Sequence, residues 1–221
     1  MRELTLDQVS YQYKGAARPA LNNVSCSFSE GQVSVILGPS GSGKTTLLSL
    51  LAGLDRPSLG KISLDGRDLA AEDMDRYRQK DISLIFQAFQ LFPLLTVLEN
   101  VCYPMELNGV SRKEAQAQAK RLLKQVGIGE EKFRRYPSRL SGGEQQRVAI
   151  ARSLASGSKI LLADEPTGNL DAENTKNVVN ILCELAHEGG YCVVIVTHDA
   201  SVAHSADHVF RMVDGCLQKA G

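Results

Sequence analysis

Residues 38–45 read Gly38-Pro39-Ser40-Gly41-Ser42-Gly43-Lys44-Thr45 and match the phosphate-binding loop pattern G-x-x-x-x-G-K-[ST] at every fixed position. The run before it, 32–37 (QVSVIL), predicts a buried strand, and the run after it, 46–52 (TLLSLLA), predicts a helix that ends at Gly53. The glycines let backbone N–H groups turn toward one point, and the helix N-terminus adds partial positive charge. We expect Lys44 to reach the β- and γ-phosphates and Thr45 to bind Mg²⁺. The stretch therefore predicts a nucleoside triphosphate site.

The composition is that of one globular domain. The chain has 221 residues, of which 43% are hydrophobic, and its 25 basic residues balance its 25 acidic ones. A neutral balance does not favour nucleic acid as a partner. No apolar run approaches the length of about 18 residues that predicts a membrane span, and the charged start MRELTLDQ does not resemble a signal peptide. Five scattered cysteines indicate reduced thiols. We expect a cytoplasmic protein that can attach to a membrane partner.

Hydrophobic patterns along the chain predict an α/β fold. Residues 2–13, 21–28 and 61–64 are expected to form an antiparallel sheet. Core strands and helices follow in alternation, with strands at 32–37, 82–86, 159–163, 192–196 and 209–213, and helical segments at 96–126, from Ser141, and at 172–186. We therefore predict a single domain over 1–221, with a helical subdomain inserted at about 88–158.

Two acids end one of the predicted core strands. The apolar run 160–163 (ILLA) is followed directly by Asp164 and Glu165. Open parallel sheets bind ligands at the carboxyl ends of their strands, so both carboxylates are expected near the phosphates. We expect Asp164 to hold Mg²⁺ through its hydration shell and Glu165 to orient and deprotonate the attacking water. The alternative is a strand that simply ends in solvated acids.

A second diagnostic stretch is 140–147 (LSGGEQQR). Ser141 and Glu144 have the spacing of a capping box, which places Ser141 at a helix N-terminus. Gly142 and Gly143 are poor helix formers that cost about 1 kcal/mol each relative to alanine. The close approach of a phosphate would account for them, and a flexible cap is the alternative.

With these stretches in order, the sequence resembles the nucleotide-binding subunit of ABC transporters from about Leu4 to Gly215. The phosphate loop, LSGGEQQR and ILLADE match three motifs of that family, Gln87 its Q-loop, 168–171 (GNLD) its D-loop, and His198 its switch histidine. Glu144 departs from the commonest signature, which has glutamine there. The resemblance implies the ABC ATPase fold, in which a P-loop NTPase core carries an antiparallel β subdomain and a helical subdomain.

The resemblance also implies roles that spacing alone does not give. Members of the family hold two ATP molecules between two subunits, so Ser141 and Gly143 would contact the γ-phosphate on the partner's loop. Gln87 would touch Mg²⁺ and the attacking water, His198 the γ-phosphate, and Asp171 the dimer interface. The implied catalytic residues are Glu165, His198 and Gln87, and the implied metal ligands are Thr45, Gln87 and Asp164. The implied nucleotide-binding residues are Tyr13, Gly38, Ser40, Gly41, Ser42, Gly43, Lys44, Thr45, Thr46, Ser141, Gly142, Gly143, Glu144 and Asp171.

Tyr13 is expected to stack on the adenine. In a strand, Tyr11 and Tyr13 would lie on one face, because side chains alternate with period two. The family's adenine-stacking aromatic aligns best with Tyr13, which leaves Tyr11 to pack nearby. The alternative is a pair of core tyrosines.

Our functional hypothesis is the ATPase subunit of an ABC transporter, peripheral on the cytoplasmic face of the membrane. It would act as a homodimer, or with a related subunit, beneath a separate permease, and the apolar stretch 88–105 would dock that permease. Two stretches, 91–104 and 163–175, most resemble subunits for macrolide export, lipoprotein release and antimicrobial-peptide resistance. The alternatives are an ABC ATPase of DNA repair or translation, which usually has two cassettes or a long coiled coil, and one that signals through a membrane partner.

Overall fold

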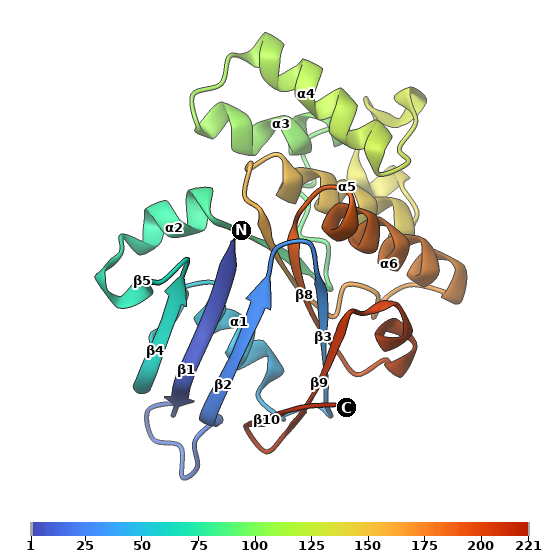
Figure 1. Ribbon diagram of the computed structural model, residues 1–221. Coiled ribbons are helices and arrows are strands. Elements are labelled where there is room, and N and C mark those ends of the chain that lie inside the picture. Colours follow the sequence, from blue (N-terminus) through green and yellow to red (C-terminus); the bar gives the residue numbers. More distant parts are fainter. Residues whose placement is uncertain (1, 221) are drawn as a thin grey trace.

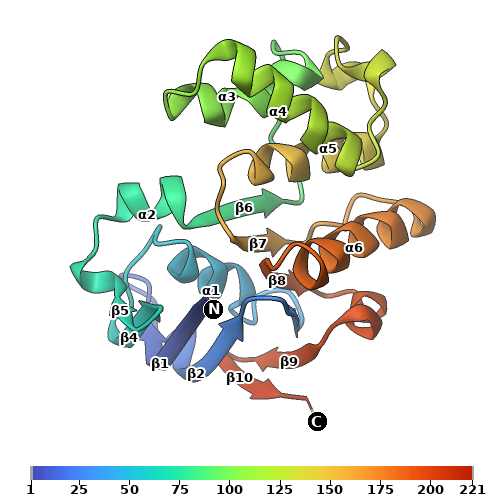
Figure 2. The same ribbon diagram turned by 45° about the horizontal axis from the view of Figure 1, so that its top comes forward.

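Two β-sheets enclose helix α1 (Lys44–Leu51) in the computed structural model, which describes residues 2–220 (Figures 1 and 2). The smaller sheet is antiparallel, as expected, with the strand order β2-β1-β4-β5. Its strands are β1 (Glu3–Tyr11), β2 (Leu21–Ser29), β4 (Leu59–Leu64) and β5 (Arg67–Asp68). The prediction that the first strand extends to Tyr13 is wrong. A register shift between Leu6 and Val9, with Gln8 at φ 51°, precedes the end of β1 at Tyr11.

The larger sheet has six strands in the order β10-β9-β3-β8-β7-β6. All of its pairings are parallel except the one between β9 and β10. The strands are β3 (Val33–Leu37), β6 (Ile82–Phe86), β7 (Ile160–Asp164), β8 (Cys192–Thr197), β9 (His208–Val213) and β10 (Cys216–Lys219). The five predicted core strands are confirmed. Strand β10 was not predicted, because it is short and mostly exposed.

The central strands are buried on both faces and separate two hydrophobic clusters. In β7, Ile160 and Leu162 join the cluster around α1 and the small sheet. Leu161 and Ala163 join the cluster on the opposite face, which the later helices cover. Each fully buried leucine or isoleucine stabilises the fold by roughly 1.5–3 kcal/mol relative to an exposed one. This double burial explains why the central strands read as unbroken apolar runs in the sequence.

Five more α-helices follow α1 in the described chain: α2 (Met74–Lys80), α3 (Val97–Leu107), α4 (Arg112–Gln125), α5 (Gly142–Leu154) and α6 (Ala172–His187). Short 3₁₀ turns occur at Leu69–Ala71, Glu130–Lys132, Pro137–Arg139 and Ala200–Ser205. The predicted helical segment 96–126 is interrupted because Gly109 has φ 81° and Ser111 caps a new helix. Helix α2 was not predicted, because its seven residues are too few for an apolar period to show.

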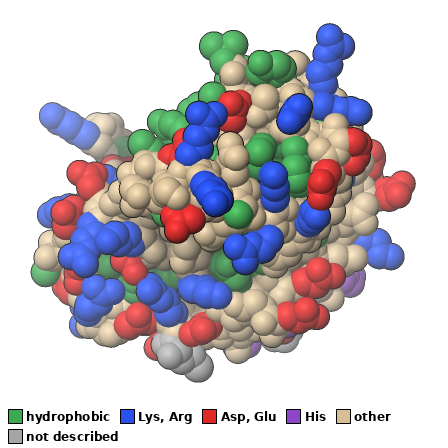
Figure 3. All heavy atoms as spheres, turned by 90° about the horizontal axis from the view of Figure 1, so that it is seen from above, with side chains coloured by type: hydrophobic (Ala, Val, Ile, Leu, Met, Phe, Trp, Pro, Cys, Tyr) green, Lys and Arg blue, Asp and Glu red, His purple; other side chains and the backbone are tan. Residues whose placement is uncertain are grey.

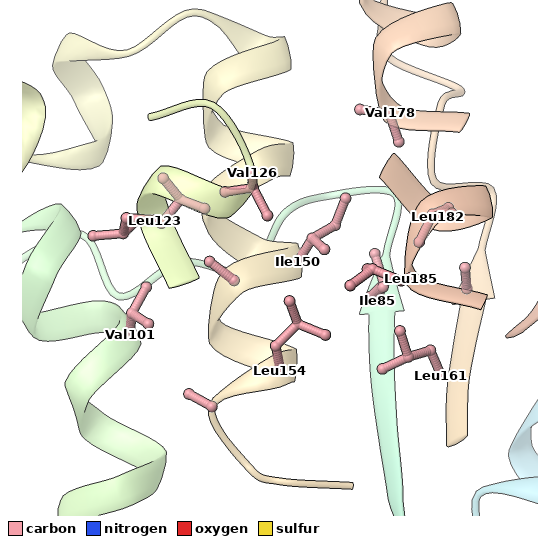
Figure 4. Close-up of a cluster of buried hydrophobic side chains, with 14 of the residues drawn as sticks. Ile85, Val101, Leu123, Val126, Ile150, Leu154, Leu161, Val178, Leu182 and Leu185 are labelled. Carbon is pink, nitrogen blue, oxygen red and sulfur yellow. The ribbon is translucent and has the colours of Figure 1, made fainter. Parts of the chain in front are cut away.

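Helix α5 connects the helical lobe to the sheet. Figure 4 shows Ile150 and Leu154 of α5 between Val101 and Leu123 on one side and Ile85 of β6 on the other. All of these side chains belong to one buried cluster, so the lobe formed by α3 and α4 shares its core with the sheet. Helix α5, whose N-terminus carries the signature stretch, is therefore held by packing on two sides in its second half.

The surface of the lobe is mixed in charge. Seen from above, basic and acidic side chains are interspersed among polar and apolar ones (Figure 3). Within residues 2–220, none of the helices combines the length and the apolar character needed to cross a membrane.

Asn100 fixes the loop that leads from β6 into α3. Its side chain is fully buried and donates to the carbonyl oxygens of Phe92 (3.1 Å), Leu95 (3.0 Å) and Thr96 (3.0 Å). Its Oδ1 accepts from the backbone N–H of Phe92 at 2.8 Å. One side-chain amide thus binds four backbone groups of this loop.

We predict that Asn100→Ala lowers the free energy of unfolding by about 1–3 kcal/mol, because buried backbone groups lose their partner. Urea denaturation followed by circular dichroism measures the change. Asn177→Ala is the control, since Asn177 is exposed on α6 and should change stability by less than about 0.5 kcal/mol. Equal stability of the two variants would contradict the assigned role of Asn100.

Candidate nucleotide site

The parallel register brings the ends of four strands to one level. Phe86 pairs with Asp164, Asp164 with Val196, and Leu37 with Thr197. The residues that follow these strand ends line or border a cleft of about 610 Å³. The cleft is lined by Tyr13, Ala20, Ser40, Gly41, Gly43, Lys44, Thr45, Thr46, Gln87, Asp164, Glu165 and His198. Eight of the other predicted site residues are thereby joined with the three predicted catalytic residues at one edge of the sheet.

The phosphate loop presents a helix N-terminus that lacks a side-chain cap. Gly43 is the N-cap of α1, with φ 107°, and the first turn of the helix contains no acidic residue. A Cβ at Gly43 would lie 2.5 Å from the carbonyl oxygen of Ala20, so only glycine fits there. Because the first N–H groups of a helix have no intrahelical acceptor, this end of α1 suits an anion.

Lys44 lies across the same loop. Its side chain is nearly buried, and Nζ donates to the carbonyl oxygens of Gly38 (2.8 Å) and Pro39 (3.0 Å). These two carbonyls hold the ammonium at the cleft, where it adds a full positive charge to the partial charge of α1. Gly38 and Ser42 are outside the cleft lining, and Ser42 is buried beneath the loop.

The predicted magnesium ligands meet at the floor of the cleft. Thr45 Oγ1 lies 3.5 Å from Asp164 Oδ1, and Gln87 lines the same cleft. Burial raises the pKa of the Asp164 carboxyl, so a nearby cation would favour its ionised form. A hydroxyl, a carboxylate and an amide are hard oxygen donors, which fit Mg²⁺. Residues 2–220 contain no group of three or more His, Cys, Asp and Glu side chains suited to a metal, so phosphate and water would have to supply the other ligands.

Glu165 is fixed by three contacts from two residues at the end of β8. Its Oε2 accepts from Thr197 Oγ1 at 2.9 Å and from the backbone N–H of His198 at 3.4 Å. Its Oε1 lies 2.9 Å from Nδ1 of His198. The backbone of Glu165 has φ 47°, a left-handed conformation that is unfavourable for a residue with a side chain. Glu165 and His198, predicted separately, are therefore direct neighbours.

Hydrogen bonds also join Gln87 to Asn169 of the D-loop. Asn169 Nδ2 donates to the carbonyl oxygen of Gln87 at 3.0 Å, and Gln87 Nε2 lies 3.4 Å from Asn169 Oδ1. Beyond Gln87, Phe89 and Gln90 both have positive φ, and Arg152 of α5 donates to both of their carbonyl oxygens. The Q-loop is thus tied to both the D-loop and α5.

Tyr13 lies at the mouth of the cleft, beyond the end of β1. Its ring is 47% exposed, its hydroxyl is 3.0 Å from Thr46 Oγ1, and it makes an edge contact with Tyr11 at 4.9 Å between ring centroids. The expectation that both tyrosines lie on one face of a strand is wrong, because the strand ends first. The expectation that Tyr11 packs nearby is confirmed.

The signature and D-loop residues do not line this cleft. Ser141 caps α5 through a complete capping box with Glu144, as predicted. Asp171 caps α6 by accepting from the backbone N–H of Asn174 at 2.8 Å, which lowers the pKa of Asp171. A Cβ at Gly143 would collide with the Asn174 side chain. Packing between α5 and α6 therefore favours glycine at 143, because a larger residue would displace the Asn174 side chain, a reason that the sequence alone did not reveal.

Comparison with known proteins identifies the fold. The family model described as ABC transporter matches residues 21–168. The chain belongs to the ABC transporter family. It is an ATP-binding, ATP-hydrolysing cassette of that family, with the ABC ATPase fold that the sequence predicted.

Individual ABC relatives cover nearly the whole chain. The ABC transporter ATP-binding protein YclH of Bacillus subtilis (strain 168) is 40% identical, covering 97% of this chain and 95% of its own. The lipoprotein-releasing system ATP-binding protein LolD of Shewanella sp. (strain MR-4) is 42% identical, covering 95% and 91%. A dimeric structure of the bacterial ABC transporter cassette MJ0796 has a TM-score of 0.88 at 38% identity and covers 99% of both chains. The same cassette was solved in a post-hydrolysis state with ADP and Pi, with a TM-score of 0.88 at 37% identity and 99% of both chains covered.

Thr197 is a site residue that sequence reasoning did not identify in this ABC cassette. It is fully buried at the end of β8, donates to Glu165, and accepts from the backbone N–H of Asp199 at 3.0 Å. The sequence signal that could have identified Thr197 is its position at the end of a predicted strand, directly before His198. Through these two bonds Thr197 sets where the Glu165 carboxylate lies.

We predict that Thr197→Val lowers kcat for ATP hydrolysis about 10- to 100-fold, because Glu165 loses a hydrogen bond to a charged group worth about 1.5–3 kcal/mol. The affinity of the monomer for ATP should stay within about twofold, since Thr197 is outside the cleft lining. Steady-state ATPase assays and nucleotide titration measure both quantities.

Thr197→Ser is the control, because it keeps the hydroxyl and should retain most of the activity. A Thr197→Val enzyme that is as fast as Thr197→Ser would show that this hydrogen bond does not position Glu165.

Proposed function

We propose that this ABC cassette powers substrate movement through a separate membrane permease, and that two copies close around two ATP molecules. The observation that carries the proposal is the separation of the site into two parts. The loop, the acids and His198 surround one cleft, whereas Ser141 is exposed at the N-terminus of α5 and does not line it. A second copy supplies that part of the site. The dimeric structure of the similar cassette supports this arrangement.

The Ser141 hydroxyl is suited to an incoming phosphate. Its oxygen accepts from the backbone N–H of Glu144 at 3.3 Å, which orients the lone pairs inward and leaves the O–H free to donate outward. In the proposed dimer, Ser141 and Gly143 meet the γ-phosphate of the ATP on the partner's loop. Asp171, exposed at the start of α6, lies at the dimer interface.

The cleft residues then have complementary roles. We assign Lys44 and the loop N–H groups to the phosphates, and the exposed ring of Tyr13 to the adenine. Mg²⁺, when bound, would offset the negative charge of the phosphates. Thr45, Gln87 and Asp164 would hold it, the last through water.

Glu165 acts as the general base, because Thr197 Oγ1 and the backbone N–H of His198 fix its carboxylate at the cleft. His198 is 64% exposed at its side chain and can turn toward a γ-phosphate. In that role it exchanges its contact with Glu165 for one with the nucleotide. The post-hydrolysis structure of the similar cassette supports a hydrolytic cycle of this kind.

A groove of about 430 Å³ beside the Q-loop is the proposed permease-docking surface. It is lined by Ala52, Arg78, Ile82, Ser83, Leu84, Gln90, Phe92, Tyr103, Pro104, Leu107, Arg152, Ser153 and Ser156. Nearby, Leu94 is 87% and Phe92 41% exposed, within the predicted stretch 88–105. Phe89 is only half-exposed, and its ring lies near Gly142, so it belongs to the interior of this region. Docking here would place the cassette at the cytoplasmic face of the membrane.

We predict that Glu165→Gln lowers ATPase turnover at least about 100-fold while ATP binding persists, because the base is lost and the phosphate loop is intact. With ATP and Mg²⁺, this variant should form stable dimers in analytical ultracentrifugation. Adding Ser141→Arg to it should abolish the dimer without weakening ATP binding by the monomer. A Glu165→Gln variant that stays monomeric at saturating ATP would refute the two-copy site.

We predict that Leu94→Glu abolishes co-purification with the permease and the permease's effect on ATPase rate. Its basal ATPase rate and melting temperature should match those of the parent, because Leu94 is almost fully exposed. Leu59→Glu is the matched control, since Leu59 is 69% exposed on β4, outside both this groove and the stretch 88–105. If Leu94→Glu binds and responds to the permease as Leu59→Glu does, the docking surface lies elsewhere.

A further inference from the structure

The carboxylate of Glu144 is held from two sides at the N-terminus of α5. Its Oε2 accepts from the backbone N–H of Ser141 at 2.8 Å, which closes the capping box. Its Oε1 lies 2.6 Å from Nζ of Lys132, in the 3₁₀ turn Glu130–Lys132. Both side chains are largely shielded, with 17% of Glu144 and 25% of Lys132 exposed. The pair is therefore partly desolvated, unlike the exposed ion pairs elsewhere on the lobe.

A carboxylate without a positive partner at this position would hinder the binding of a second copy's triphosphate, which the proposed function requires. Glu144 lies within one turn of Ser141, which meets the triphosphate of a second copy in that proposal. Contact with Lys132 lowers the pKa of Glu144, so the carboxyl is ionised at neutral pH. An unneutralised anion beside Ser141 would repel the phosphates, whereas the Lys132 ammonium offsets that charge at 2.6 Å, although it also lies 3.7 Å from Glu131 Oε1.

We propose that Lys132 is a positioning residue of the nucleotide site. Through Glu144 it fixes the Ser141 cap and neutralises the carboxylate, so that the N-terminus of α5 attracts the triphosphate bound by a second copy. This inference rests on the proposed two-copy site. It names a residue outside the signature positions 141–144 that the sequence assigned to nucleotide binding. It also explains how this chain tolerates an acidic residue at 144. Glu144 needs a positive partner, which Lys132 supplies, whereas a neutral glutamine would not need one.

The test uses the Glu165→Gln chain with ATP and Mg²⁺, in which dimers accumulate. Lys132→Met should raise the protein concentration at half-dimerisation about tenfold, measured by analytical ultracentrifugation. ATP affinity of the monomer should not change, because Lys132 is absent from the cleft lining. Lys132→Arg keeps the charge and should dimerise like the Glu165→Gln parent.

A rescue experiment separates this role from a merely structural one. In chains that also carry Glu144→Gln, Lys132→Met should change dimerisation by less than about twofold, because no carboxylate is left to neutralise. Lys124→Met is the matched control for net charge. It removes an exposed lysine that pairs with Glu130 at 2.5 Å on the same lobe, and it should leave dimerisation unchanged.

Each outcome decides the proposal. A tenfold shift with Lys132→Met that disappears in the Glu144→Gln background supports it, and Lys132→Gln replaces the methionine variant if the latter does not fold. Normal dimerisation of Lys132→Met, or an equal loss with and without Glu144→Gln, overturns this inference and leaves the two-copy site standing. If the Glu165→Gln parent itself stays monomeric, the two-copy site and this inference both fail.

Discussion

The parallel hydrogen-bond ladder of the large sheet is the constraint on which the site depends. Because Phe86, Asp164 and Val196 are paired across neighbouring strands, and Leu37 is paired with Thr197, the chain emerges from four strands at one level. The next residues are Gln87, Glu165, His198 and the first glycine of the phosphate loop. A slip of one residue in any strand would turn its core side chains to the wrong face, so burial on both faces of the sheet fixes the chemistry at its edge.

Three helix N-termini in this molecule differ in how their free N–H groups are used. Helix α1 begins at Gly43 without a side-chain cap, whereas α5 and α6 begin at Ser141 and Asp171 and are capped by their own side chains. The N-terminus of α1 suits an anion that the same chain binds, because its first backbone N–H groups have no side-chain cap. The serine cap at α5 accepts from one N–H group of the helix and still has a hydroxyl proton to donate.

Short-range patterns allowed the sequence to predict much of this structure. The phosphate loop, the buried strands, the capping boxes and the acids after β7 are all encoded within about ten neighbouring residues. Contacts between distant residues could not be predicted, and these include Thr197 with Glu165, Gly143 against Asn174, and Lys132 with Glu144. The position of Tyr13 was also hidden, because β1 ends at Tyr11 and Tyr13 lies beyond the strand. Sequence thus predicts which residues serve the site better than it predicts what holds them.

The left-handed backbone of Glu165 has a consequence for how this chain can change. A residue with a side chain held at φ 47° costs about 1–3 kcal/mol, which glycine or asparagine would largely relieve. Selection for a sturdier fold alone would therefore favour replacing the one carboxylate that faces His198. In the proposed function Glu165 is the general base, so the strained backbone belongs to a residue that the reaction needs. Attempts to raise the melting temperature of this protein should begin elsewhere, on the strands of the antiparallel sheet, which contain none of the residues that line the cleft or the groove.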